Sequence, residues 1–517
     1  MSLISKYFES DFLGELSQWE NSLKSELKLT EIGTRALKKN LDGSTWPTLS
    51  LKAAVTTHLG AQESWKKASV TYANLPKDKV SSWIAEDLKT GVRNFFFFGD
   101  LIAEGELREA LDVLGKSTAA KEVEVFLLGE GTRNLPGYPF PVVSGILRGS
   151  AAHDGGGHSS LELAELAVKL ARAPEEDFFL GVYVDSQFFN NIAKIRAAKL
   201  LARRILDLRG SKARFKVVAL TSYGDWTLFE RYSNILRNET AVAAAYIAGA
   251  DHVQSSGYNV LFDLETDAKV DEHTDRSRRM ARNTSHVLAL ESMLGTVTDA
   301  AHGSFHLENL TQHLCESAWK KFQELVALDA ATLRTTIDAE AATVRAKRLE
   351  LVKTRKHVQA GMNDYPDVSE VLNLKVSPRH KVFRAASAFE DLRLKVEGLG
   401  KKPEVQVALF GEYGALNARL NFVKNYFELL GLRVHDPGHS VTDLEEFHRS
   451  LTGKPDAILV LCALDEQYPS VLPLAAGLKN QNKFIAGKVE APGFTNLFAG
   501  QNVFDVLSAL VARWGNK

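Results

Sequence analysis

Short apolar runs alternate with helical patterns along most of this 517-residue chain, and this alternation limits the possible folds more than any other feature. Buried parallel strands have the length and continuous hydrophobicity of these runs, which lie at 94–98, 123–128, 178–184 and 215–220. Between two of them, residues 192–208 carry apolar side chains at steps of three and four, as an amphipathic helix does. Repeated strand–helix units predict an α/β fold. Their recurrence over residues 89–330 favours a closed (β/α)8 TIM barrel over an open sheet.

A second strand–helix pattern begins after Pro403, where a stretch rich in Gly, Lys and Pro marks a domain boundary. A strand at 405–410 precedes a helical pattern that ends near Gly431, a suitable C-cap residue. Further predicted elements lie at 457–462, 471–478, 484–487 and 503–514. The pattern predicts a small doubly wound, flavodoxin-like domain at 404–517.

The two remaining regions are predicted to be mainly helical. Residues 1–88 form an N-terminal helical arm in this prediction, with Trp19, Trp46 and Trp65 as packing anchors. Residues 331–403 form a helical linker, because their first part, to residue 356, is rich in charge and alanine and suits a solvated helix.

Charge and cysteine content exclude several classes of protein. Lys and Arg number 63 against 64 Asp and Glu, so no overall field would attract nucleic acid or an anionic membrane. Cys315 and Cys462 lie far apart and outside any CxxC spacing, which argues against a disulfide framework or a zinc site. The N-terminus lacks the pattern of a signal peptide, and no apolar run is long enough for a membrane span. We therefore expect a cytoplasmic protein with protein or small-molecule partners.

Five ordered motifs identify a family. They are Ile-Ala-Lys-Ile-Arg-Ala-Ala-Lys at 192–199 with Lys194 and Arg196, Met-Ala-Arg-Asn-Thr at 280–284 with Arg282 and Asn283, the segment 299–311 with Asp299 and Glu308, Gly-Met-Asn-Asp-Tyr-Pro at 361–366, and Phe-Glu-Asp-Leu-Arg at 389–393. In this order they resemble the methylmalonyl-CoA mutases. The resemblance implies a TIM barrel followed by a cobalamin-binding-type domain, and an adenosylcobalamin-dependent interconversion of methylmalonyl-CoA and succinyl-CoA.

The C-terminal region departs from the pattern of catalytic members. Their Asp-x-His-x-x-Gly motif supplies an imidazole to cobalt, with an aspartate behind it. This chain has Glu412, Tyr413 and Gly414 there, and no histidine at 405–432. His435 and His439 follow, and we expect them to be exposed loop residues at the wrong edge of the sheet.

The chain departs from the family in two further places, one in the predicted barrel and one in the N-terminal arm. Ser255 lies where the resemblance places the catalytic histidine. His252, an odd number of residues earlier, should face the other side of the strand. In addition, Arg35 is the one arginine among the first 92 residues, although catalytic members have an Arg- and Tyr-rich segment there for the CoA phosphates.

These departures lead to an interpretation as the non-catalytic small subunit of a heterodimeric methylmalonyl-CoA mutase in propionate metabolism. The chain would contain no catalytic, cofactor-binding or metal-binding residues, and a large catalytic subunit would bind the adenosylcobalamin. Two alternatives remain open: an active acyl-CoA mutase with unusual cobalamin binding, and a free-standing scaffold that senses CoA esters.

Three other features have simpler structural interpretations. The glycine-rich stretch before His158 matches no phosphate-loop pattern, and we expect Ser159 or Ser160 to cap the following helix. His302 and His306 lie near Asp299 but lack a second ligand motif, so a metal site is not expected. Arg282, Asn283 and Glu308 are predicted to join loops to helices through polar networks at the barrel rim.

Overall fold

A computed structural model describes the chain at residues 21–22, 24–25, 37–39, 45–47, 69–72, 77–98, 102–128, 137–263, 270–294, 296–297, 299–372, 375–376, 382–441, 457–475 and 482–515. Trp19, Trp65 and Arg35 lie outside these residues. The chain divides into two compact units, each of which is described by itself. Unit 1 comprises Met1–Ser222, Glu239–Ser256 and Arg282–Val344, and unit 2 comprises Tyr223–Asn238, Gly257–Ala281 and Arg345–Lys517.

Unit 1 contains two four-stranded parallel sheets, so the fold is α/β as predicted. The first sheet has the order β3 (Ser69–Tyr72), β4 (Asn94–Phe98), β5 (Glu124–Leu128) and β6 (Val142–Val143). The second has the order β10 (His252–Val253), β9 (Phe215–Thr221), β8 (Phe178–Val184) and β7 (Ile146–Arg148). A short antiparallel pair, β1 (Leu37–Lys39) and β2 (Thr45–Pro47), precedes them.

All four apolar runs of the first pattern are strands, with ends shifted by at most one residue. The parallel sheet nevertheless begins earlier than the sequence pattern predicted. Strand β3 pairs with β4 through Val70 and Phe95, so the predicted boundary at residue 89 falls inside the sheet region. The apolar run that would have predicted β3 was weak, because this strand has only four residues and two of them are polar.

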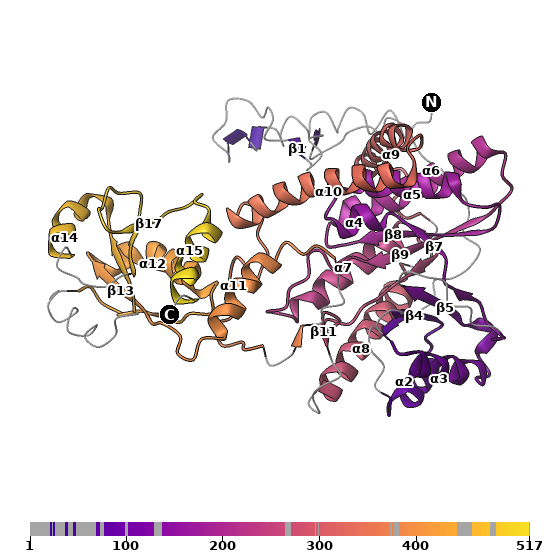
Figure 1. Cartoon of the computed structure of the whole chain (residues 1–517), viewed down its shortest axis with the longest axis horizontal. Coiled ribbons are helices and arrows are strands. Elements are labelled where there is room, and N and C mark those ends of the chain that lie inside the picture. Colours follow the sequence, from indigo (N-terminus) through magenta and orange to yellow (C-terminus); the bar gives the residue numbers. More distant parts are fainter. Residues whose placement is uncertain are drawn as a thin grey trace. The chain divides into compact units, whose positions relative to one another are not determined.

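Helices lie between several of the strands along the chain (Figure 1). Helix α6 (Phe188–Arg209) contains the predicted helix at 192–208. The others, as far as Lys353, are α2 (Val80–Lys89), α3 (Glu104–Gly115), η2 (Ala120–Glu122), α4 (Ser150–Asp154), α5 (Ser159–Arg172), α7 (Ser233–Ile247), α8 (Val270–His286), the π-helical turn η3 (Val287–Glu291), α9 (Phe305–Leu325) and α10 (Ala330–Lys353). None of the helices within the described ranges combines the length and apolar composition needed to cross a membrane.

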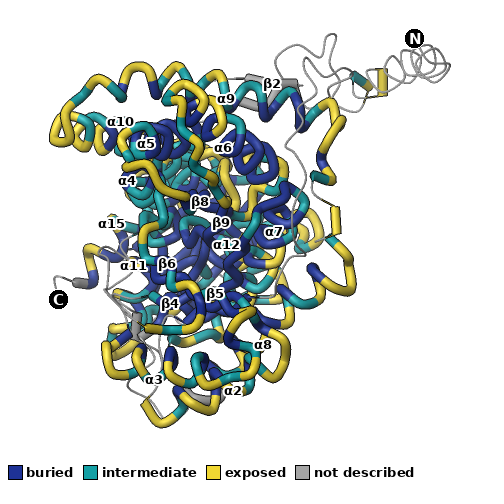
Figure 2. The backbone as a smooth tube through the Cα atoms, turned by 90° about the vertical axis from the view of Figure 1, so that its right-hand side faces the viewer, coloured by how far each residue is buried: buried dark blue, intermediate teal, exposed yellow. Residues whose placement is uncertain are grey.

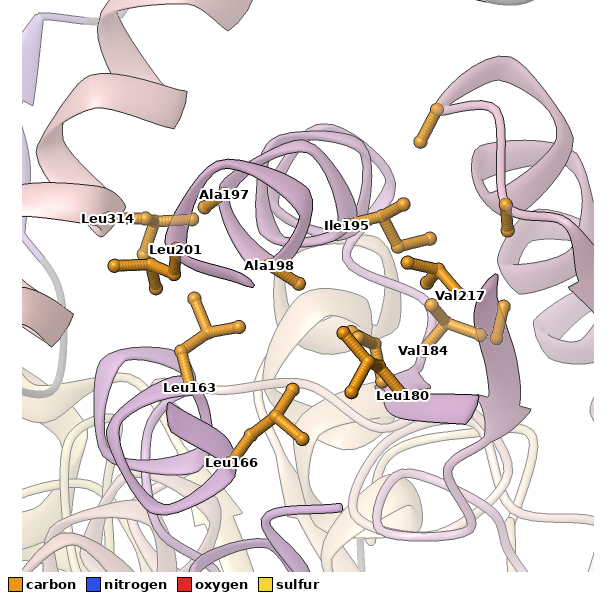
Figure 3. Packing of buried hydrophobic residues seen from close by; sticks show 14 of the residues in the cluster. Leu163, Leu166, Leu180, Val184, Ile195, Ala197, Ala198, Leu201, Val217 and Leu314 are labelled. Carbon is orange, nitrogen blue, oxygen red and sulfur yellow. The ribbon is translucent and has the colours of Figure 1, made fainter. Parts of the chain in front are cut away.

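Alternate residues of β8 and β9 face a layer of helices. Leu180, Val184 and Val217 pack against α5, α6 and α9, and Figure 3 shows how their side chains meet. The helical residues labelled there are Leu163, Leu166, Ile195, Ala197, Ala198, Leu201 and Leu314. Figure 2 shows the strands in the buried interior and the outer turns of α2 and α3 exposed.

The other face of both sheets contributes to one aromatic cluster, called here the inner cluster. Its buried members are Phe96, Phe126, Leu128, Val143, Tyr183, Val218 and Leu220, with Phe98, Ile146 and Phe179 against them. The Phe126 ring of the first sheet meets the Phe179 ring of the second edge to face, 5.9 Å apart. A further contact joins the edge strand β3 of the first sheet to the residues after β10, the edge strand of the second. There, the Thr71 hydroxyl donates to the Ser255 carbonyl at 2.6 Å. The two sheets therefore share a packed inner face.

Unit 2 contains a five-stranded parallel sheet with the order β14 (Val434–His435), β13 (Val405–Phe410), β15 (Ile458–Ala463), β16 (Asn482–Ala486) and β17 (Thr495–Leu497). Counted along the chain, this is strand order 2-1-3-4-5. Among the described residues after Pro403, its helices are α12 (Tyr413–Glu428), the 3-10 turn η4 (Asp465–Gln467), α14 (Tyr468–Ala475) and α15 (Val503–Gly515). Unit 2 also contains α11 (Ser387–Glu397) and an antiparallel pair, β11 (Phe262–Asp263) and β12 (Lys375–Val376).

The predicted charged helix at 331–356 coincides with α10. It is not solvated on all sides, however, because Ile337, Ala341, Val344 and Val352 are buried. Gly431 has a left-handed backbone with φ of 67°, as expected after a helix end, although α12 itself ends three residues earlier.

Candidate functional site

The motif residue Arg196 lies at the centre of a buried polar network in unit 1. Its guanidinium contacts Asp299 Oδ2 at 3.2 Å, Thr311 Oγ1 at 3.0 Å and Glu308 Oε1 at 2.7 Å. Glu308 also accepts a hydrogen bond from the Gly303 backbone at 3.0 Å. Helix α6 therefore holds the start of α9 and the loop before it, which gives three motif residues one structural role.

Lys194, two residues before Arg196, forms a second buried ion pair. Its Nζ lies 3.0 Å from Glu162 Oε2, and Glu162 Oε1 accepts from the Tyr183 backbone N–H at 2.9 Å. Burial raises the pKa of Glu162, and Lys194 and the Tyr183 N–H oppose that shift. The pair links α5, α6 and β8. Tyr183 continues the contacts, because its ring stacks on His153 with the centroids 3.6 Å apart.

Arg282, on α8, reaches the N-terminal part of unit 1. Its Nη1 lies 2.7 Å from Asp87 Oδ1 on α2, and Asp87 also accepts from the Tyr72 hydroxyl on β3. The neighbouring motif residue Asn283 is exposed, and its place in a polar network at the rim stays a prediction. Arg282 and Glu308 have the predicted kind of contacts, in separate networks.

His252 packs against two rings of the inner cluster. Its ring centroid lies 4.8 Å from that of Phe126 and 6.0 Å from that of Phe179, and its Nδ1 is 3.6 Å from Glu124 Oε2. Glu124 is the first residue of β5, so the imidazole lies towards the amino ends of the strands. Ser255 follows two residues after β10 and is completely buried.

The three residues in place of Asp-x-His-x-x-Gly lie at the start of α12 rather than in an extended turn. Glu412 is the N-cap residue and is exposed, and Tyr413 and Gly414 form the first helical turn. The Tyr413 hydroxyl donates to Asp436 Oδ2 at 3.0 Å, and the same oxygen accepts from Lys424 Nζ at 2.6 Å. The hydrogen bond from Lys424 lowers the pKa of Asp436, and the bond to Asp436 raises that of Tyr413.

Arg419 and Tyr468 occupy the carboxyl ends of β15 and β16. Arg419 donates to the Ala463 carbonyl, to the Ala486 carbonyl at 3.0 Å and to Asp465 at 2.9 Å. The buried Tyr468 hydroxyl donates to the Ala486 carbonyl at 2.6 Å and accepts from the Ala463 N–H at 3.1 Å. This edge of a parallel sheet is where ligands of open α/β folds bind. Here, Arg419 and Tyr468 of the chain itself donate hydrogen bonds to the carbonyls at these two strand ends.

His435 and His439 are both exposed, as predicted, but one of them lies at an unexpected edge. His435 pairs with Gln406 near the amino end of β13. The chain then runs beside β13, because the Val441 N–H donates to the Leu409 carbonyl at 2.7 Å and Ser440 donates to the Gly411 carbonyl. His439 is therefore next to the carboxyl edge, and its prediction at the wrong edge is corrected.

The other predicted histidines have structural contacts. His158 is itself the N-cap of α5: its Nδ1 accepts from the Leu161 N–H at 3.2 Å, so neither Ser159 nor Ser160 is the cap. His302 Nδ1 lies 3.9 Å from Glu308 Oε1, and the His306 ring meets Phe189 edge to face at 5.8 Å. Within the described ranges, no three His, Cys, Asp or Glu side chains gather closely enough to hold a metal ion.

Several residues with central contacts were missed from the sequence. Glu162, Asp87 and Thr311 complete the motif residues' networks, and Arg419 and Tyr468 occupy the sheet edge. The basic motif residues Lys194, Arg196 and Arg282 signalled that acidic partners were needed, since buried charges are paired. No local pattern identified which acidic residues those were.

Comparison with known proteins agrees with this arrangement. The family model described as methylmalonyl-CoA mutase matches residues 166–396. The methylmalonyl-CoA mutase small subunit of Porphyromonas gingivalis is 29% identical over 68% of this chain and 62% of its own length. The corresponding figures are 31%, 63% and 55% for the small subunit of Streptomyces virginiae, and 27%, 62% and 53% for that of Propionibacterium freudenreichii subsp. shermanii. The chain thus spans little more than half the length of these relatives.

The matched region contains the motif residues whose side chains form the networks around Arg196, Lys194 and Arg282. The family model and the relatives agree with the motif order, and residues 166–396 of this chain match the methylmalonyl-CoA mutase family.

Proposed function

We propose that this chain is the non-catalytic small subunit of a heterodimeric, adenosylcobalamin-dependent methylmalonyl-CoA mutase. A large partner subunit would interconvert methylmalonyl-CoA and succinyl-CoA. In this proposal the eight parallel strands β3 to β10 form one (β/α)8 barrel around the inner cluster. The sheet of unit 2, with strand order 2-1-3-4-5, is a flavodoxin-like, cobalamin-binding-type domain.

The observation that carries the proposal is the packing of the inner cluster. Phe96 and Phe126 stack at 4.7 Å, and Phe126 also contacts Phe179 and His252. An acyl-CoA whose reacting carbons entered this interior would have to displace large aromatic rings. Displacing even one packed Phe side chain costs on the order of 3–5 kcal/mol, as truncations to Ala indicate. The packing of the inner cluster therefore favours a structural role for this chain over a catalytic one.

Ser255 and His252 support the same conclusion. Imidazole is the side chain most often used for proton transfer near neutral pH, and a serine hydroxyl does not titrate there. His252 does not compensate, because it lies near Glu124 at the amino ends of the strands. Active sites of barrel enzymes lie at the carboxyl ends.

The residues at the carboxyl edge of the unit 2 sheet do not fit cobalamin held through a histidine. Glu412 is exposed, the Tyr413 hydroxyl bonds to Asp436, and Arg419 donates to the carbonyls of two strand ends. None of these groups is an imidazole oriented by a carboxylate. The proposal therefore assigns cobalamin to the large subunit.

The proposed location is the cytoplasm. Both cysteines are free, and burial raises the pKa of each thiol to about 12. Thiols of this kind remain protonated and suit a reducing compartment.

Reconstitution with a purified mutase large subunit of the same organism tests the proposal. We expect a one-to-one complex in analytical ultracentrifugation, and isomerisation of methylmalonyl-CoA only when the large subunit and adenosylcobalamin are both present. Turnover by this chain alone, with adenosylcobalamin, would reject the proposal. Tight CoA-ester binding by calorimetry, without a complex, would instead favour a CoA-sensing scaffold.

His439 supports a second candidate, an active acyl-CoA mutase with unusual cobalamin binding. Its exposed imidazole lies next to the carboxyl edge, where a ligand of such a sheet would bind. Titration of the chain with adenosylcobalamin, followed by absorbance, distinguishes the two. Saturable binding that is lost in His439→Ala would favour the second candidate, whereas spectra unchanged by the protein would favour the first.

A further inference from the structure

The turn that follows α8 exposes four apolar side chains within eleven residues. The exposed fractions are 41% for Val287, 59% for Leu290, 58% for Met293 and 52% for Val297. Isolated exposed apolar residues are ordinary, but neighbouring ones mark contact sites for other molecules. We call these four residues the apolar turn.

The backbone beneath the apolar turn is fixed. Leu288 and Ala289 are buried in the main core of unit 1. The Ser292 N–H donates to the Val287 carbonyl at 2.8 Å, which closes the π-helical turn, and the Leu294 N–H donates to the Leu288 carbonyl at 3.1 Å. Single π-helical turns occur frequently at functional sites. A fixed backbone also lowers the entropy lost when a partner binds.

Met293 has a left-handed backbone, with φ of 53°. A side chain with a Cβ is strained in this conformation by roughly 1–2 kcal/mol, and glycine is not. Two hydrogen bonds keep the strained turn in place, because the Met293 carbonyl accepts from the Thr296 N–H at 3.2 Å and from its hydroxyl at 2.7 Å. A residue that is strained and also exposes an apolar side chain indicates a use for that side chain.

The chemistry of the segment favours a protein as the occupant. Residues 283–303 include no lysine or arginine. Nucleic acids and anionic membranes are bound through such cations. Protein interfaces, in contrast, are depleted of charge at their centre and enriched in methionine. The segment lies within residues 166–396, which match the family model. Relatives of this chain are named as small subunits.

We propose that the apolar turn is a docking surface for the large mutase subunit. This inference rests on the proposed function and adds the place of contact. Leu290 and Met293, the two most exposed members, are the expected anchors, and the conformation of Met293 sets the direction of its side chain before binding.

Two variants, Leu290→Ser and Met293→Gly, test this inference in the full chain against the purified large subunit of the same organism. Isothermal titration calorimetry should give a dissociation constant raised at least about tenfold for each, as expected for interface anchors. Met293→Gly should leave the thermal midpoint of the isolated chain unchanged or higher, because it relieves the left-handed strain. Weakened binding would then not result from unfolding.

Matched controls make the same changes elsewhere. Leu208→Ser alters an exposed leucine of α6, with 69% of its surface accessible, and Tyr365→Gly alters a residue with φ of 51° and 78% accessible surface. Both should bind within about twofold of the original chain, as is usual for surface substitutions.

Each result of this experiment supports or rejects the docking surface. If the unaltered chain binds and the two test variants bind equally well, the apolar turn is not the contact, while the proposed function stands. If the unaltered chain does not bind the large subunit, both proposals are wrong. If the test variants only convert a homodimer of this chain to monomers, the surface contacts a second copy and the assignment to the large subunit is rejected.

Discussion

Arg196 Nη2 lies 2.7 Å from Glu308 Oε1, and both side chains are completely buried although 112 residues separate them in the chain. Asp299 and Thr311 accept from the other two guanidinium nitrogens, Nε and Nη1. Removing one member of a buried pair leaves the other charge without compensation, which costs more than the pair contributes when intact.

Replacing Arg196 with Met should therefore destabilise the chain by about 3–5 kcal/mol, because Glu308 and Asp299 would keep their charges in a buried site. Urea unfolding followed by circular dichroism measures this change.

Arg214→Met is the matched control for this variant. Arg214 pairs with Asp177 at 2.8 Å, a similar distance, but both side chains are largely exposed. Exposed pairs contribute about 0–1 kcal/mol. Equal losses in the two variants would contradict a special role for the buried network.

Phe126→Ala should destabilise the isolated chain by about 3–5 kcal/mol, because it leaves a cavity between the rings of Phe96, Phe179 and His252. Thermal or urea unfolding provides the measurement. Phe305→Ala, at a partly exposed position on α9, should cost far less. A small loss for Phe126→Ala would mean that the interior has room for a ligand.

Glu340 should make stability depend on acid pH. Its hydrogen bond with His158, followed by that with Lys321, lowers its pKa below the ordinary 4.5. Since the unfolded chain binds this proton more readily, the stabilisation is present above pH 4.5 and is lost as the pH falls through the lower folded value. Glu340→Gln should reduce stability at pH 7 by about 1 kcal/mol or less, after allowance for solvent screening, and should have a smaller effect near pH 3.

Thermal midpoints at the two pH values measure this dependence. Glu466, which is exposed in the 3-10 turn η4 of unit 2, offers a control as Glu466→Gln. The control should change the midpoint little at either pH. A pH-independent effect of Glu340→Gln would contradict the linkage to its ionisation.

Arg419→Leu should loosen the ends of β15 and β16, because the Ala463 and Ala486 carbonyls would lose a charged donor. The loss of about one net hydrogen bond predicts roughly fivefold faster amide exchange in peptides that contain these ends. Hydrogen–deuterium exchange with mass spectrometry measures it. Asn417→Ala, at an exposed position of the same helix, should leave exchange unchanged. Uniform acceleration across the chain would indicate global rather than local destabilisation.

Local elements could be predicted because they follow from backbone geometry and burial. The run at 94–98 is strand β4, since a short continuous apolar run is typical of a buried strand. The helical periodicity at 192–208 lies within α6, since a period near 3.6 is visible in neighbouring residues. The prediction failed where the local signal was short or had several explanations. β3 carries only four residues, and the cap of α5 is His158 although two serines follow it.

The amino-acid sequence by itself determined the α/β class, the longer strands and helices in their order, and the motif residues that resemble the methylmalonyl-CoA mutases. The tertiary structure alone decided which partners those residues have. Arg282 meets Asp87 across 195 residues, and Glu308 meets Arg196 across 112. It also decided that His252 packs among phenylalanine rings and that His439 lies next to the carboxyl edge. Such pairings depend on the path of the whole chain, because many acidic residues could neutralise a given arginine and only packing brings one of them within hydrogen-bond distance.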